Sequence, residues 1–276
     1  MMKKKSNTAL LNAPRAYLSE TPIPHYLSYH GAQLQQIGKR SHQEDSFAFV
    51  NISDVTLMRT RGLLAVVADG MGGMKDDKIA SEAAIARIKA DFESMDVTSD
   101  IPTRLRDSMI RANDEIFATL NAQGGSTGII CVFYNECLYY ASVGDSYLIL
   151  KRGDGIYHLN RKQNMFTRVC LQQIREGSVD CTPARTHPEK AALTCFLGMR
   201  ELKDIDYVLR PIPLMDGDVV LLCSDGVGGV LDEDQLKECL SASSPEQMCR
   251  LMHEKVEAAG RRFQDNYTAL VVQCEY

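Results

Sequence analysis

The sequence lacks a long apolar run, a strongly basic composition and an abundance of aromatic residues. No hydrophobic stretch approaches the roughly 20 residues of a membrane-spanning helix, and the apolar stretch near the N-terminus is too short for a signal peptide. The net charge of −5 and the aromatic content of 7% argue against a nucleic-acid partner, because such partners need basic surfaces and stacking platforms. We therefore expect a protein that binds neither membranes nor nucleic acid.

The chain also lacks the Cys-x-x-Cys spacing of zinc and redox motifs, although it contains nine cysteines. That number is odd, and several cysteines lie inside apolar runs, such as Cys131 in TGIIC and Cys223 in VVLLC. The six histidines show no spacing typical of metal ligands. Free, mostly buried thiols in a reducing cytoplasm fit this usage best.

The remaining composition is that of an ordinary globular protein, with 276 residues of which 45% are apolar and 24% charged. This length suits one large domain or two small ones. Residues 1–28 contain three prolines and show no clear periodicity. We interpret them as a tail or a strap over the domain.

The pattern of apolar residues predicts an α+β protein in which runs of strands are interrupted by helices. Residues 161–192 are charged and poorly periodic, and we expect an irregular loop with a short helix there. Two antiparallel sheets packed face to face with helices outside, a four-layer α-β-β-α sandwich, is the expected fold. The predicted strands are 46–52, 62–68, 127–134, 137–144, 146–153, 155–160, 218–224 and 267–274, and the predicted helices are 78–95, 102–122 and 244–260.

Acidic residues recur at the ends of the predicted strands. In VVADGMGG, for example, Asp69 directly follows a buried run and precedes glycine. A single Asp-Gly of this kind is most simply a turn. The same pattern repeats at several strand ends, however, and turns alone do not explain the repetition. The acidic residues in such positions are Glu44, Asp45, Asp69, Asp145, Asp225 and Asp265.

A cluster of carboxylates needs positive counter-charge, because like charges repel. Oxygen ligands suit Mg²⁺ or Mn²⁺, and the absence of a Cys/His ligand set argues against zinc. Two such ions that share a water lower its pKa, turn it into a nucleophile and clamp the oxygens of a phosphoryl group. The pattern therefore indicates metal-dependent phosphoryl chemistry without a nucleophilic side chain.

With these residues in place, the sequence resembles the metal-dependent Ser/Thr protein phosphatases of the PP2C type, in a bacterial-like form. The resemblance runs from Tyr29 to Cys274 and implies one phosphatase domain over residues 29–276. Its motifs occur in the order of the family. They are GKRSHQED (38–45), VADGMGG (67–73), GSTG (125–128), VGDS (143–146), LTCFLG (193–198), CSDGVGG (223–229) and DNYTALVV (265–272).

The resemblance implies roles for the acidic residues. Asp69 would bridge two Mn²⁺ or Mg²⁺ ions, and the carbonyl of Gly70 would contribute to one of them. Asp225 and Asp265 would bind the other ion. The adjacent pair Glu44 and Asp45 need not both bind an ion directly, since neighbouring side chains of an extended chain face opposite ways. In the family that the sequence resembles, such a pair acts largely through metal-bound waters.

The resemblance also implies three further roles. Arg40 would bind the substrate phosphate, for which a guanidinium fork is suited, and Asn266 would bond a water or oxygen of the site. Asp145 would help to hold a third, weaker metal ion. Without the motifs, Arg40 would be a solvated surface cation and Asp145 a hairpin residue.

The chain departs from the family pattern at a few positions. Met71 stands where many eukaryotic members have a histidine, and Tyr147 stands where an arginine usually follows VGDS. Residues 162–164 read KQN where the family often has Asp-His-Ser, and Gln43 replaces a frequent asparagine. None of these changes removes a direct metal ligand, so we expect an active enzyme. The region 161–192 would form the flap that shapes substrate access.

The function that the resemblance implies is hydrolysis of phosphoserine and phosphothreonine in proteins by a hydroxide that bridges the metal ions. The catalytic residues would be Arg40, Asp69, Asp225 and Asp265, and the partners would be Ser/Thr kinases or their substrates, met by a cytoplasmic monomer. Two alternatives remain at this point. One is a non-catalytic domain of the same fold that binds a ligand or partner, and the other is a metal-dependent phosphomonoesterase for small molecules.

Overall fold

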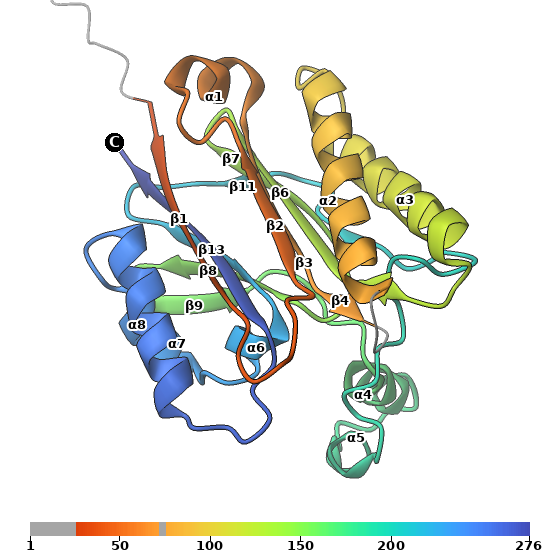
Figure 1. Cartoon of the computed structure of the whole chain (residues 1–276). Helices are drawn as coiled ribbons and strands as arrows, with labels where there is room; N and C mark the ends of the chain where they lie inside the picture. The colour runs from red at the N-terminus through yellow and green to blue at the C-terminus, as the bar shows by residue number, and fades with distance from the viewer. Residues whose placement is uncertain (1–25, 72–75) are drawn as a thin grey trace, which may run out of the picture.

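The computed structural model describes residues 26–71 and 76–276, and it shows two antiparallel sheets packed face to face with helices on both outer faces (Figure 1). This four-layer arrangement confirms the predicted fold class. The tail that the sequence predicts over residues 1–28 lies mostly outside the described residues. Leu27 is buried between the sheets and the first strand begins at Ser28, so the predicted domain boundary at residue 29 falls inside that strand.

The first sheet contains both ends of the described chain. The first strand of the chain pairs with the last strand along its full length. The partner of β1 is β13, and each further neighbour is also antiparallel. In spatial order the strands are β1 (Ser28–Gln36), β13 (Tyr267–Glu275), β12 (Val219–Cys223), β8 (Tyr147–Arg152) and β9 (Gly155–His158).

The second sheet contains the middle of the chain. Its order is β10 (Asp206–Tyr207), β7 (Cys137–Val143), β6 (Gly128–Tyr134), β3 (Leu63–Ala68) and β2 (Ser46–Val50), and β11 (Ile212–Pro213) also pairs with β7. A separate short ladder joins β4 (Gly70–Met71) to β5 (Gly125–Ser126).

Strand β3 shows why the central strands read as continuous apolar runs. Leu63, Ala65 and Val67 point into the core between the two sheets. The alternate residues Leu64 and Val66 point to the other face, where they pack against helices. Because successive side chains alternate between two buried faces, no polar residue interrupts the run.

Helices close the two outer faces of the sandwich. On the second sheet, α2 (Asp76–Ser94) and α3 (Ile101–Leu120) pack side by side, whereas α7 (Glu233–Leu240) and α8 (Pro245–Ala258) cover the first sheet (Figure 1). Asp100 caps α3 by accepting a hydrogen bond from the backbone of Thr103. None of the helices in the described residues is both long and apolar enough to cross a membrane.

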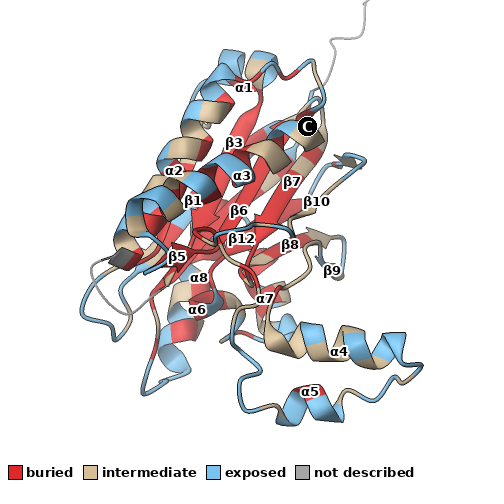
Figure 2. Cartoon of the chain, turned by 90° about the vertical axis from the view of Figure 1, so that its right-hand side faces the viewer, coloured by how far each residue is buried: buried red, intermediate tan, exposed pale blue. Residues whose placement is uncertain are grey.

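A pair of short helices projects from the body in the region where we predicted an irregular loop with one helix. The helices are α4 (Met165–Arg175) and α5 (Thr182–Thr186), and every residue of α4 is half-buried or exposed (Figure 2). The backbone nitrogens of Met165 and Phe166 donate to the carbonyls of Ala192 and Lys190. These bonds connect the start of α4 to the turn that leads back to the body.

Candidate metal centre

The antiparallel pairing brings the predicted acidic residues to one end of the sandwich, where strands of both sheets begin or end. Ala68, at the end of β3, lies opposite Ser46, at the start of β2. Cys223, at the end of β12, lies opposite Ala269 in β13 and Tyr147 in β8. Residues that follow β3 and β12 therefore meet residues that precede β2, β8 and β13.

A cavity of about 300 Å³ opens at this end, and its lining is strongly polar. Of the predicted metal ligands, all except Asp45 line it. The lining residues are Arg40, Glu44, Asp69, Gly70, Met71, Asp77, Thr127, Asp145, Ala191, Leu193, Asp225 and Asp265. Carboxylates separated by more than two hundred positions in the sequence are thus gathered around one space.

Asp69 lies at the centre of this arrangement because its backbone is held on both sides. Its N–H donates to Thr127 Oγ1 at 3.1 Å. Its carbonyl accepts from the backbone N–H of Thr127 at 2.8 Å and from Ser126 Oγ at 3.0 Å. The GSTG motif therefore holds the backbone of Asp69 and so sets the direction of its side chain.

Gly70 illustrates how closely the backbone segments approach one another here. A Cβ at this position would lie 2.3 Å from the carbonyl oxygen of Asp77 and 2.8 Å from that of Glu44. Only glycine fits between these two carbonyls. The residue that was predicted to offer its own carbonyl to a metal ion thus lies where three segments of the site converge.

Asp45 lies behind the cavity and is only 1% exposed. Its Oδ2 accepts a hydrogen bond of 2.8 Å from Ser224 Oγ, while its Oδ1 is a buried oxygen without a hydrogen-bond partner among the described residues. Glu44, by contrast, lines the cavity. The two neighbouring side chains therefore face different ways, as the extended-chain argument predicted.

Mutual repulsion and burial raise the pKa values of the clustered carboxyl groups. Burial raises the pKa of Asp69 well above its usual range, and Asp45, Asp225 and Asp265 add to the effect. Burial likewise raises the pKa of Asp45 to about 6. Solvent reaches Asp225 in the cavity, yet desolvation by the surrounding protein, together with Asp145 and Asp265, raises its pKa to about 7. Such groups lose this penalty when positive charge joins them.

The donor set fits a hard divalent cation. Carboxylate oxygens, a glycine carbonyl and one unpartnered buried oxygen are available, and oxygen ligands of this kind suit Mg²⁺ and Mn²⁺. Within residues 26–71 and 76–276, no three acidic, histidine or cysteine side chains already form a close ligand set. The individual ligand assignments remain predictions.

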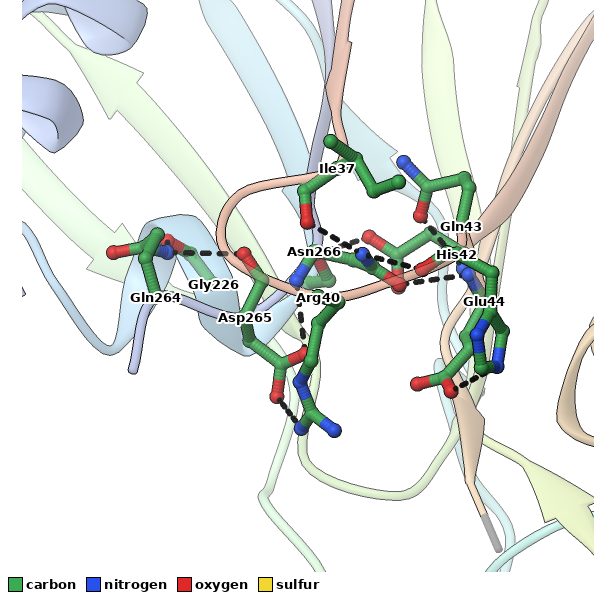
Figure 3. A network of polar contacts seen from close by, with 11 residues as sticks. Ile37, Arg40, His42, Gln43, Glu44, Gly226, Gln264, Asp265 and Asn266 are labelled. Carbon is green, nitrogen blue, oxygen red and sulfur yellow. Dashed lines mark hydrogen bonds and ion pairs between the residues drawn. The ribbon is translucent and has the colours of Figure 1, made fainter. Parts of the chain in front are cut away.

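Arg40 lies at the mouth of the cavity, and it is paired with a predicted metal ligand. One terminal nitrogen of its guanidinium donates to Asp265 Oδ2 at 2.6 Å (Figure 3). The pairing raises the pKa of Arg40. About half of the Arg40 side chain is exposed, so the rest of its fork of donors faces open space.

Asn266 is 2% exposed, and its amide holds the backbone of the loop that carries Arg40 and Glu44. Its Nδ2 donates to the carbonyls of Ile37 and His42 at 2.8 and 3.1 Å (Figure 3). Its Oδ1 accepts from the Glu44 N–H at 2.7 Å. These contacts turn the amide toward the loop, whereas the sequence predicted a bond to a water or oxygen of the site.

Two groups in or beside the cavity were missed from the sequence. Asp77, near the start of α2, lines the cavity and adds to the rise in the pKa of Glu44. Its position shortly after the DGMGG motif was the available signal. Lys162 lies beside Asp145, where it opposes the burial effect that raises the pKa of that carboxyl group. The KQN triplet at 162–164 marked a departure from the family pattern, but it did not indicate that Lys162 lies beside Asp145.

A carboxylate-lined cavity at the shared end of the two sheets of an α-β-β-α sandwich is suited to metal-dependent hydrolysis of phosphate esters. Comparison with known proteins identifies the family. The family model for protein phosphatase 2C matches residues 35–174. The chain belongs to the PP2C family.

Relatives and solved structures extend the similarity over most of the chain. The serine/threonine phosphatase stp of Listeria innocua is 26% identical over 247 residues, which cover 85% of this chain and 91% of that protein. The phosphatase PstP/Ppp of Mycobacterium tuberculosis shares the fold, with a TM-score of 0.73 at 22% identity over 90% of this chain and 99% of that one. A structure of the catalytic domain of PstP with two manganese ions has a TM-score of 0.72 at 22% identity, over 91% of this chain and 100% of that one.

Proposed function

We propose that this protein is a phosphatase that hydrolyses phosphoserine and phosphothreonine in proteins and depends on Mn²⁺ or Mg²⁺. The observation that carries the proposal is the cavity that gathers Asp69, Asp225 and Asp265 together with Arg40. The family and the printed names of its relatives support the same activity.

Two ions would be held by Asp69, Asp225, Asp265 and the Gly70 carbonyl, with Glu44 and Asp45 acting largely through waters. When bound, the ions supply an activated water and positive charge against the phosphoryl oxygens. A PstP structure described with two manganese ions supports this number.

The chain's own residues bind and orient the substrate. Arg40 offers the free part of its guanidinium to two phosphate oxygens while Asp265 steadies the other side of the fork. Asn266 keeps this loop in place through its bonds to Ile37 and His42. Met71, which also lines the cavity, has no proton to donate to the leaving group, so that proton comes from elsewhere in the site.

The proposal also covers the cellular compartment, the oligomeric state and the protein substrates. All nine cysteines are free thiols, which supports a reducing cytoplasm as the compartment. We propose a monomer that acts on Ser/Thr kinases or on their phosphorylated substrates. The projecting α4–α5 segment, within the predicted flap, would contact those proteins, because Ala191 and Leu193 at its base line the cavity.

Turnover of two substrates tests the proposal against its rivals. p-Nitrophenyl phosphate and a phosphothreonine peptide are each assayed with Mn²⁺ and with EDTA. We expect Mn²⁺-dependent release of phosphate from both. Turnover of neither substrate would favour the non-catalytic binding domain, and turnover of the small ester alone would favour a small-molecule phosphomonoesterase.

A further inference from the structure

Lys162 places a positive charge in a fixed position beside the acidic cavity. Its ammonium nitrogen lies 3.1 Å from the centroid of the Tyr147 ring. That ring is backed by α6 (Asp225–Gly228), since a Cβ at Gly228 would lie 2.5 Å from the ring atoms. A cation over an aromatic face is stabilised by the negative potential of the ring. The Tyr147 ring is therefore packed between α6 and the Lys162 ammonium.

The residue that follows Lys162 holds its backbone in place. Gln163 is 1% exposed, and its Oε1 accepts from the Gly144 N–H at 2.8 Å while its own N–H donates to the Gly144 carbonyl at 2.9 Å. Its Nε2 donates to the carbonyl of Asp204 at 2.7 Å. Because Gly144 directly precedes Asp145, these bonds keep Lys162 next to that carboxylate.

The charges around Lys162 are almost all negative. Asp145 and Asp225 both attract its ammonium group and oppose the lowering of its pKa by burial. Burial raises the pKa of Tyr147, and nearby acidic groups add to this effect, so the supporting ring stays neutral. Lys162 is thus a cation placed on the side of the cavity formed by Asp145 and Asp225.

Both residues of this pair stand at positions where the sequence departs from the pattern of the family that it resembles, and here they are in contact.

We propose that the Lys162 ammonium is a built-in cation that neutralises Asp145, so that the site takes two divalent ions and Asp145 holds no third one. Lys162 is a positioning residue, because it acts on the carboxylates and not on the substrate. The inference rests on the proposed metal-dependent function. It assigns Asp145 a role different from the one that the family resemblance implies.

Isothermal titration of the full-length protein with Mn²⁺ tests this inference. We expect two ions per chain for the wild type. Lys162→Met removes the charge but keeps a long side chain on Tyr147, and it should bind Mn²⁺ roughly tenfold more tightly, because a nearby repulsive charge is lost. Lys162→Arg should retain the wild-type affinity, and Lys162→Asp should gain a third ion.

Lys255→Met is the matched control, since Lys255 lies on α8 in an exposed pair with Glu238, and it should leave Mn²⁺ binding unchanged. Three ions in the wild type, or an unchanged affinity in Lys162→Met whose fold is confirmed by circular dichroism, would overturn the inference and leave the proposed function intact. A wild type that binds no Mn²⁺ would overturn the proposed function itself, and this inference with it.

Discussion

At the scale of single residues, the account depends on carboxylates that the fold forces together. Burial and mutual repulsion raise the pKa values of Asp69, Asp45 and Asp225. Carboxyl groups whose burial and mutual repulsion destabilise the folded protein indicate a functional site rather than a stabilising cluster. The same reasoning explains why neighbouring groups, such as Arg40 and Lys162, carry positive charge.

Replacing the central carboxylate separates its chemical role from its structural one. We expect Asp69→Asn to lower kcat/KM by more than about a hundredfold, since even the outer partners of metal ligands cost roughly ten- to a hundredfold. The fold should persist, because the substitution also removes a repelling charge. Steady-state kinetics and thermal unfolding in EDTA measure the two effects. Near-normal turnover would contradict the assignment.

Arg40 is expected to act on the substrate more than on the ions. Arg40→Ala should raise KM for a phosphothreonine peptide by roughly ten- to a hundredfold, the loss expected for charge-assisted hydrogen bonds to phosphate. Its effect on Mn²⁺ affinity should be smaller, and Arg40→Lys should recover part of the loss. If KM is unchanged in Arg40→Ala, the arginine serves only as the surface partner of Asp265.

At the scale of elements, the site depends on one loop that joins β1 to β2. This loop carries both Arg40 and Glu44, and the amide of Asn266 at the start of β13 holds it through three hydrogen bonds. The site is therefore assembled by side-chain contacts between distant strands, and the geometry of the cavity follows from the stability of this junction.

Removing the Asn266 amide tests that junction. Asn266→Ala leaves the backbone groups of Ile37, His42 and Glu44 without their partner, which should cost about 3 kcal/mol of unfolding free energy. Urea unfolding measures this loss. Activity with saturating Mn²⁺ should fall as well, because the loop positions Arg40. A variant with wild-type stability would show that the loop is held in some other way.

The sequence predicted the elements that are apolar on two faces or capped by recognisable residues. Strand β3 and helices α3 and α8 are examples, and their positions are close to those expected. Strand β1 was missed because glutamines occupy much of its exposed face. Helices α1 (Val55–Arg61) and α7 were missed because each is short, and a helix of two turns depends on packing that one sequence window does not reveal.

For the site, strand ends and motifs were sufficient to identify the carboxylates of the cavity. Pairwise contacts were not predictable, because they depend on how distant segments meet. Three examples are the bond between Arg40 and Asp265, the position of Lys162 over Tyr147, and the bonds of the Asn266 amide to the loop between β1 and β2.

At the scale of the whole molecule, the sandwich places a cluster of like charges at the shared end of its two sheets. The metal-free protein should then lose stability as the pH rises, since carboxyl groups with raised pKa values favour the folded state only while protonated. For Asp45 this loss extends from its ordinary pKa to about 6, and for Asp225 it extends to about 7.

Thermal unfolding in EDTA at pH 5.5 and pH 8 measures this dependence, where the lower midpoint is expected at pH 8. Addition of Mn²⁺ at pH 8 should raise the midpoint, because the ions bind the folded state. The same Mn²⁺ should have little effect on Asp69→Asn. A metal-free protein that is more stable at pH 8 than at pH 5.5 would show that repulsion in the cluster is not a dominant cost.

The most direct test of the account is the anomalous scattering of manganese in crystals soaked in Mn²⁺. We predict two peaks in the cavity, both close to Asp69, with Asp225 and Asp265 beside one of them. We predict no third peak beside Asp145, where Lys162 supplies the positive charge. No peak in the cavity, or coordinates in which Asp69, Asp225 and Asp265 lie apart, would contradict the central claim.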